Sequence, residues 1–263
     1  MKKTLWTVNI DNYAPEVTAL TYPLLRRYAE KCSAEFRVIS DRKFPDWPPA
    51  YEKLQIHELG RDSDWNIYID SDAVVHPGLF DITNHLTPDT VCHNAKDMAG
   101  NRWKYDQYFR RDGRHIGSCN WFAVGSNLCL DLWRPLDDLT LEEALANIYP
   151  TVHELSEFVW RCTNTQCNYE VPTNSQGESE SKCTACSQPR KKLAKAKIDA
   201  AHLLDDYALS RNIARFGLKF TTIRDIQAKL GDQAFYLWHM YTLTLEDKIR
   251  QTRDVLHNWG LDT

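Results

Sequence analysis

The stretch of sequence that decides the fold is WNIYIDSDAVVHP, residues 65–77. It begins as a continuous apolar run, which is typical of a strand covered on both faces of a parallel sheet. Asp70 and Asp72 then follow, one residue apart, where that strand is expected to end. Burying two neighbouring carboxylates is costly because like charges repel, so we expect a positive group to lie between them.

The residues around this stretch alternate between strand and helix patterns. Strands are expected at 4–10, 35–40 and 66–70, and helices are expected at 16–32 and 50–60. A β-α-β-α-β order predicts a three-layer α/β/α domain built on a mostly parallel sheet. Ligands bind such sheets beyond the carboxyl ends of the strands, which is where Asn9, Asp41 and Asp70 are expected to lie.

The paired aspartates predict a site for a divalent cation. Residues i and i+2 of an extended segment share one face, so Asp70 and Asp72 can reach the same ion. Mg²⁺ and Mn²⁺ suit such a pair, because both take oxygen ligands and bind substrate phosphates. The alternative is a solvated loop that happens to contain two aspartates, since Asp-X-Asp is a common triplet.

The second half of the chain is less regular. Residues 120–133 predict another strand and a following segment, 139–160 have a helical pattern in two pieces, and 198–217 return to a helical pattern. Residues 161–192 differ in being polar and poor in aliphatic side chains. We therefore expect an inserted module at 161–192, with 1–160 and 193–263 forming the larger domain.

Four of the eight cysteines lie in this predicted module, at Cys162, Cys167, Cys183 and Cys186. Two close pairs with fifteen residues between them have the spacing of a four-cysteine structural Zn²⁺ site, as in a zinc ribbon. Disulfides are the alternative, and the scattered positions of the other cysteines disfavour them. A site closed by four thiolates has no open position for catalysis.

Composition and charge limit the partners and the compartment that the sequence predicts. The chain has 263 residues, of which 43% are hydrophobic, and a net charge of −4, so no global field for nucleic acid is present. The basic run after the cysteines is either a contact for nucleic acid or an acidic partner, or a solvated helix start; it comprises Arg190, Lys191, Lys192, Lys195 and Lys197. No apolar run is long enough to span a membrane, and no signal peptide is recognisable, which predicts a cytoplasmic protein.

Residues 52–77, EKLQIHELGRDSDWNIYIDSDAVVHP, resemble the core of the GT-A fold glycosyltransferases. These enzymes transfer a sugar from a nucleotide sugar, with a divalent metal, usually manganese, on the diphosphate. The resemblance implies that Asp70 and Asp72, with Ser71 between them, bind this metal and that Lys53 lies near the donor. By position alone, it also implies the nucleotide contacts Asn9, Asp41 and Tyr13.

Residues 202–217, HLLDDYALSRNIARFG, resemble the late acidic motif of the same family. The resemblance implies that Asp205 and Asp206 face the acceptor, with Asp206 as the preferred base. The alternative is an acidic first turn of a helix, which is favoured by the helix dipole.

Two more segments add to the resemblance. YLWHMY, residues 236–241, contains His239, which the resemblance implies is a further ligand of the catalytic metal; a core histidine is the alternative. HIGSCNWFAVGSN, residues 115–127, is similar to the segment that lines the sugar and acceptor side. It implies contacts at Gly117, Ser118 and Asn120.

The leading hypothesis is a glycosyltransferase that moves a sugar from a nucleotide-diphosphate sugar to an acceptor hydroxyl, with Mn²⁺ or Mg²⁺ at the donor and a structural Zn²⁺ in the module. One alternative is an adaptor that binds nucleic acid or protein through the zinc ribbon on an inactive α/β scaffold. Another is a nucleotidyltransferase, which also pairs carboxylates around a divalent ion. The zinc ribbon favours a macromolecular acceptor.

Overall fold

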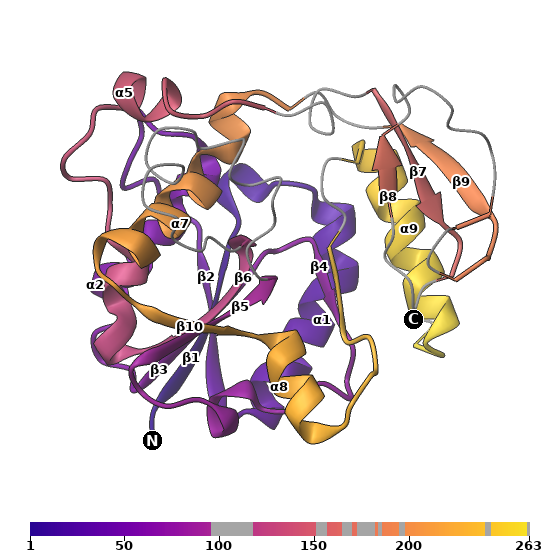
Figure 1. The fold of residues 1–263 in the computed structure, drawn as a ribbon, viewed down its shortest axis with the longest axis horizontal. Coiled ribbons are helices and arrows are strands. Elements are labelled where there is room, and N and C mark those ends of the chain that lie inside the picture. The colour runs from indigo at the N-terminus through magenta and orange to yellow at the C-terminus, as the bar shows by residue number, and fades with distance from the viewer. Residues whose placement is uncertain are drawn as a thin grey trace.

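The computed structural model of the chain describes residues 1–95, 118–150, 157–164, 170–172, 182–183, 186–194, 198–239 and 243–261. Its main body is built on a six-stranded sheet with the order β10-β5-β6-β3-β1-β2 (Figure 1). The strands are β1 (Lys3–Val8), β2 (Ala34–Ile39), β3 (Trp65–Ile69), β5 (Thr90–Ala95), β6 (Ser118–Ser126) and β10 (Lys219–Thr222). β6 is antiparallel to both of its neighbours, β3 and β5, whereas the other pairings are parallel.

Helices cover both faces of this sheet. The described helices are α1 (Pro15–Lys31), α2 (Ile56–Leu59), α5 (Leu141–Leu145), α7 (Leu204–Arg215), α8 (Ile223–Leu230) and α9 (Leu245–Asn258). Shorter 3-10 segments are η1 (Ile10–Asn12), η2 (Pro49–Gln55), η3 (Ile82–His85), η4 (Asn127–Trp133) and η5 (Ala200–Leu203).

The central strand β3 shows why the domain has three layers. All five of its residues are buried, as expected for a strand between two layers of helices. Ile67 packs in the same hydrophobic cluster as Leu25 of α1, whereas its neighbour Tyr68 packs with Leu209 of α7 on the opposite face. The predicted three-layer α/β/α class, with a mostly parallel sheet, is confirmed.

The helix expected at 50–60 has a different form in the structure. It is the 3-10 segment η2 followed by the single turn α2, which ends at Gly60. A residue with a side chain could not easily replace this glycine, because its Cβ would lie 2.6 Å from Oδ1 of Asn66. The tight approach brings the end of α2 against β3.

A separate two-stranded sheet begins directly after the paired aspartates. β4 (Ala73–Val75) pairs antiparallel with β11 (Leu237–His239), and His239 lies opposite Ala73. This register brings a residue from near the C-terminus next to Asp72.

A three-stranded sheet lies beside α9, away from the main sheet (Figure 1). It consists of β7 (Phe158–Cys162), β8 (Glu170–Pro172) and β9 (Arg190–Ala194), with β7 in the middle. The helical pattern expected up to residue 160 is therefore wrong at its end, where Phe158, Val159 and Trp160 favour a strand. The helix start considered for the basic run is wrong for residues 190–194, which form β9.

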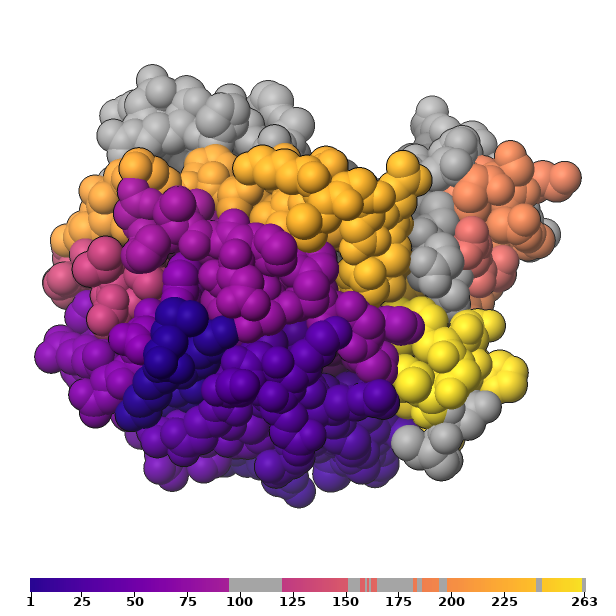
Figure 2. Space-filling view, turned by 90° about the horizontal axis from the view of Figure 1, so that it is seen from below, coloured from indigo at the N-terminus to yellow at the C-terminus, as the bar shows by residue number. Residues whose placement is uncertain are grey.

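Figure 2 shows the surface of this arrangement from another side. α9, in yellow, lies against the main body, and the chain around β9, in orange, lies next to α9. No helix among the described residues combines the length and the apolar character needed to cross a membrane.

Candidate functional site

A cavity lies where the sequence predicts a site, at the carboxyl ends of β1 and β3. Its volume is about 660 Å³, which is within the usual range for ligand sites. Asn9 and Asp70 directly follow the two strands. Residues of the lining that carry polar chemistry include Asn9, Tyr13, Asp70, Asp72, Asp205 and Lys248.

Asp70, Asp72 and His239 meet at the wall of this cavity. One ligand atom from each lies within 4.8 Å of the others, as a shared metal ion requires. Nε2 of His239 is 3.2 Å from Oδ1 of Asp72 and 3.5 Å from Oδ2 of Asp70. The imidazole is also stacked on Trp121, with ring centroids 5.0 Å apart. Packing and the β4–β11 register thus fix the orientation of the histidine.

Asp72 is buried, yet its surroundings favour the charged form. Burial alone would raise the pKa of its carboxyl, but the charges of Lys248 and His239 lower that pKa well below its usual range. Nζ of Lys248 donates to Oδ2 of Asp72. The same contact raises the pKa of Lys248 although the lysine is buried.

Lys53 links the two acidic parts of the site. Its buried Nζ lies 2.5 Å from Oδ2 of Asp205 and 3.2 Å from Oδ1 of Asp70. It also donates to the backbone carbonyl of Asn120. Burial would lower the pKa of Lys53, but the two carboxylates raise it, so the ammonium remains charged.

Asp205 differs from Asp72 in the direction of its pKa shift. Burial raises the pKa of Asp205, and the charge of Lys53 opposes that rise without cancelling it. The backbone N–H of Asp206 donates to Oδ1 of Asp205 at 2.9 Å. Asp205 therefore lines the cavity as a carboxyl of raised basicity.

Most of the other predicted site residues lie at or near the cavity. Asn9, Tyr13, Ser71 and Asn120 are part of its lining. Asp206 is buried at the start of α7, next to Asp205, and is not among the described residues of the lining.

Three further predicted residues are not among the described residues of this lining. Asp41 follows β2 but is exposed, and its backbone carbonyl accepts from Gln55 rather than facing the described lining. Ser118 is the first residue of β6. Gly117 lies outside the described residues.

Lys248 was missed by the sequence analysis. It lies on α9, on the same buried face as Gln251, Thr252 and Val255. Helical spacing of i, i+3, i+4 and i+7 groups these positions, so a lysine on an otherwise buried helix face was the available signal.

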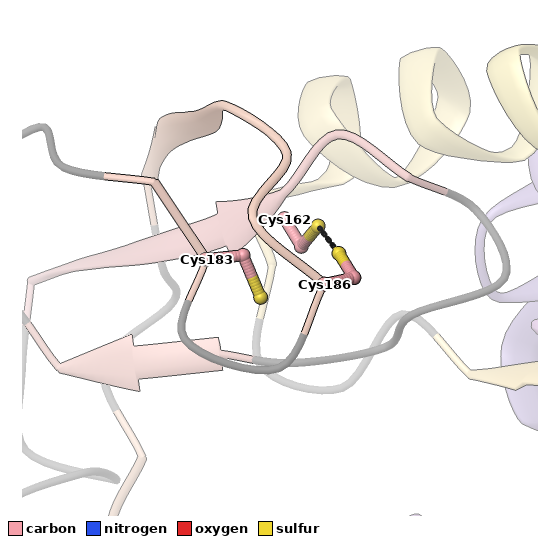
Figure 3. A group of neighbouring side chains, drawn as sticks. All are labelled: Cys162, Cys183 and Cys186. Carbon is pink, nitrogen blue, oxygen red and sulfur yellow. Dashed lines mark hydrogen bonds between the residues drawn. The ribbon is translucent and has the colours of Figure 1, made fainter.

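Three of the four predicted zinc ligands come together in the small module (Figure 3). Cys162 ends β7, and Cys183 and Cys186 lie on the turn before β9. One sulfur atom from each lies within 4.8 Å of the others, and Sγ of Cys162 is 3.3 Å from Sγ of Cys186. Cys167 lies outside the described residues.

Comparison with known proteins by sequence gives no match, either to an established family or to a curated protein. Comparison of folds finds a solved structure described as a glycosyltransferase involved in the glycosylation of the major capsid of PBCV-1. It is 8% identical to this chain, with a TM-score of 0.44 over 96% of this chain and 98% of that one. This likeness is too distant to assign an activity, so the function is argued from the site.

Proposed function

We propose that this protein is a metal-dependent glycosyltransferase that moves a sugar from a nucleotide-diphosphate sugar to an acceptor hydroxyl. The observation that carries the proposal is the meeting of Asp70, Asp72 and His239 at the wall of the cavity. This cavity lies at the edge of a mostly parallel sheet where nucleotides commonly bind.

The chemistry of the donor set fits Mn²⁺ better than Mg²⁺. Two carboxylates suit either ion, but Mg²⁺ strongly prefers oxygen ligands, whereas an imidazole nitrogen is acceptable to Mn²⁺. When bound, such an ion would neutralise charge on the donor's diphosphate. The ligands for it would be Asp70, Asp72 and His239.

Tyr13 and Lys248 would bind the nucleotide part of the donor. Tyr13 is 52% exposed at the cavity, so its ring would be available to stack on a base. Nζ of Lys248 is 3.3 Å from the Tyr13 hydroxyl. A charged ammonium beside a stacking ring suits the phosphates that follow a nucleoside.

Asp205 would accept a hydrogen bond, and then the proton, from the acceptor hydroxyl. A hydroxyl is a weak nucleophile at neutral pH, so a carboxylate within reach increases its reactivity. The raised pKa of Asp205 makes it a better proton acceptor than an exposed aspartate. Lys53 would orient it, since one Asp205 oxygen is bound by that ammonium. The sequence favours Asp206 as the base. In this proposal Asp206 would instead help to hold Asp205 in place, because its backbone N–H donates to Oδ1 of Asp205.

The test is donor turnover with a panel of nucleotide sugars and Mn²⁺, measured as released nucleoside diphosphate. We expect one or a few donors to be hydrolysed slowly without an acceptor. The variant carrying Asp70→Asn and Asp72→Asn should lose this turnover, whereas Asp89→Asn, which changes an exposed aspartate paired with Lys219, should retain it. Absence of both turnover and binding for every donor would contradict the proposal.

The same assay separates the two alternatives. A nucleotidyltransferase would release pyrophosphate from nucleoside triphosphates. An adaptor would neither turn over nor bind any donor.

A further inference from the structure

The cysteine cluster is a second set of metal-ligating side chains, and sugar transfer does not use it. It comes from β7 and from the turn before β9, in the small sheet that lies beside α9 and away from the six-stranded sheet (Figures 1 and 3). Cys162 and Cys183 are each 2% exposed. Three buried or half-buried thiols that face one another form a built site rather than a chance surface group.

We propose that Cys162, Cys183 and Cys186 bind one Zn²⁺ ion, and that this ion fixes the small module against α9 and the strands that carry the acidic site. The zinc site stands independently of the proposed sugar transfer. Its effect on Asp72, His239 and Lys248 is through packing alone.

The sulfur geometry supports a metal site. A tetrahedral Zn²⁺ with Zn–S bonds of about 2.3 Å places its sulfurs about 3.8 Å apart. The three sulfurs here lie within 4.8 Å of one another, and the pair from Cys162 and Cys186 lies at 3.3 Å. None of these three cysteines forms a disulfide among the described residues. A fourth ligand is predicted at Cys167, from the spacing in the sequence.

The described strands of the module are short. β7 and β9 have five residues each and β8 has three, and a small sheet of this kind is marginal without further support. Bound Zn²⁺ is a common source of folding free energy in such modules. Because the thiols must lose their protons to bind Zn²⁺, that contribution depends on pH.

Residues of β9 join the module to the rest of the protein. Leu193 of β9, which is 1% exposed, belongs to a hydrophobic cluster with residues of three other elements. These are Val255 and Leu256 of α9, Val74 of β4 and Trp238 of β11. An ion pair adds to the contact, since Nζ of Lys191 lies 3.0 Å from Oδ2 of Asp254.

This hydrophobic cluster contains residues that are close in the chain to residues of the acidic site. Val74 is two residues after Asp72, and Trp238 precedes His239, while Lys248 is two turns before Val255 on α9. A change in the packing of Leu193 therefore reaches the elements that carry three groups of the site. We infer that the zinc-bound module acts as a structural support for them.

Metal analysis of the full-length protein tests the zinc site. We expect one zinc per chain, retained on dialysis, and loss of it in Cys162→Ser and Cys183→Ser. Cys129→Ala removes a buried thiol of the main body and should retain the zinc. Because a serine variant may fail to fold, the wild type is also exchanged with Co²⁺, where thiolate-to-cobalt charge-transfer absorption is expected. A zinc-free protein with thiols oxidised to a disulfide would overturn the site.

Hydrogen exchange tests the support. Amides of α9 should exchange at least about tenfold faster after zinc is removed, while amides of β1 and β3 stay unchanged. Both samples are kept free of Mn²⁺, so that occupancy of the acidic site does not differ between them.

A second variant separates the contact from the metal. Leu193→Ala should keep its zinc and still increase exchange in α9. Unchanged exchange in α9 after both zinc removal and Leu193→Ala would overturn the support. Neither result depends on a sugar donor, so failure here and failure of the proposed function are distinguishable.

Discussion

The two clusters of metal-ligating side chains in this protein differ in what surrounds them. Asp70 and Asp72 lie at the end of a fully buried strand, and lysines of the protein already contact both carboxylates. One of the three cysteines ends β7 and the other two lie on the turn before β9, in a sheet of three short strands whose described contribution to a hydrophobic cluster is Leu193. The first cluster is thus supported by a large core, and the second is not.

Under the two proposals made above, this difference gives metal a different role in each place. Charged groups can be kept open to a ligand where a core supplies the folding free energy and nearby cations balance the charge. Where a core is missing, the metal supplies that free energy, and the site is closed to ligands. Removing metal should therefore abolish chemistry at the first cluster and structure at the second.

The largest expected effect is on turnover at the acidic cluster. Asp70→Asn combined with Asp72→Asn should lower donor turnover about a thousandfold, since charge stabilisation by a bound metal contributes several kcal/mol. Circular dichroism should show an intact fold, because the core around β3 is unchanged. If this variant keeps its Mn²⁺ affinity and its turnover, the acidic cluster is not a catalytic metal site.

The next effect concerns charge balance inside the acidic cluster. Lys53→Met should lower the free energy of unfolding by about 3 kcal/mol, because it leaves Asp205 buried without its cation. The pKa of Asp205, already raised by burial, should rise further. Denaturation with urea measures the change.

The loss in Lys53→Met should depend on pH in a definite direction. A carboxyl whose pKa is higher in the folded state destabilises that state as pH rises from its unfolded pKa, near 4, to its folded pKa. The difference from the wild type should therefore be smaller in acid and larger at neutral pH. Lys219→Met, at an exposed ion pair that solvent screens, should show a much weaker trend.

A smaller effect is expected where the module meets α9. Leu193→Ala should lower the free energy of unfolding by about 2 kcal/mol through loss of buried contacts. Leu128→Ala, at a 69% exposed leucine, should change it by less than about 0.5 kcal/mol. Equal effects from the two variants would show that the module is not joined to the core through Leu193.

The smallest effect distinguishes the role of Lys248 from that of the metal ligands. Lys248→Met should weaken donor binding about tenfold, as one charge-assisted hydrogen bond to a phosphate is lost. Turnover at saturating donor should change less, since the metal ligands remain. Isothermal titration with Mn²⁺ and donor measures the affinity, and a loss confined to turnover would contradict this role.

The two clusters also differ in how far the sequence predicts them. The cysteine spacing alone predicts that Cys162, Cys183 and Cys186 share one metal site, because these cysteines lie on a single short segment. At the acidic cluster, spacing predicts Asp70 and Asp72 but not their partners. His239 and Asp205 entered through a resemblance, and Lys248 was missed.

What the sequence determined by itself is local: an apolar strand ending in paired aspartates, the order of strands and helices, and two close pairs of cysteines. The tertiary structure alone decided that β6 runs against its neighbours, that His239 lies opposite Ala73, and that Lys248 contacts Asp72. The physical reason is that these contacts join elements that are separated along the chain, by more than 150 positions for His239 and Lys248. Side-chain periodicity says which face of an element is buried, whereas packing of whole elements decides what that face meets.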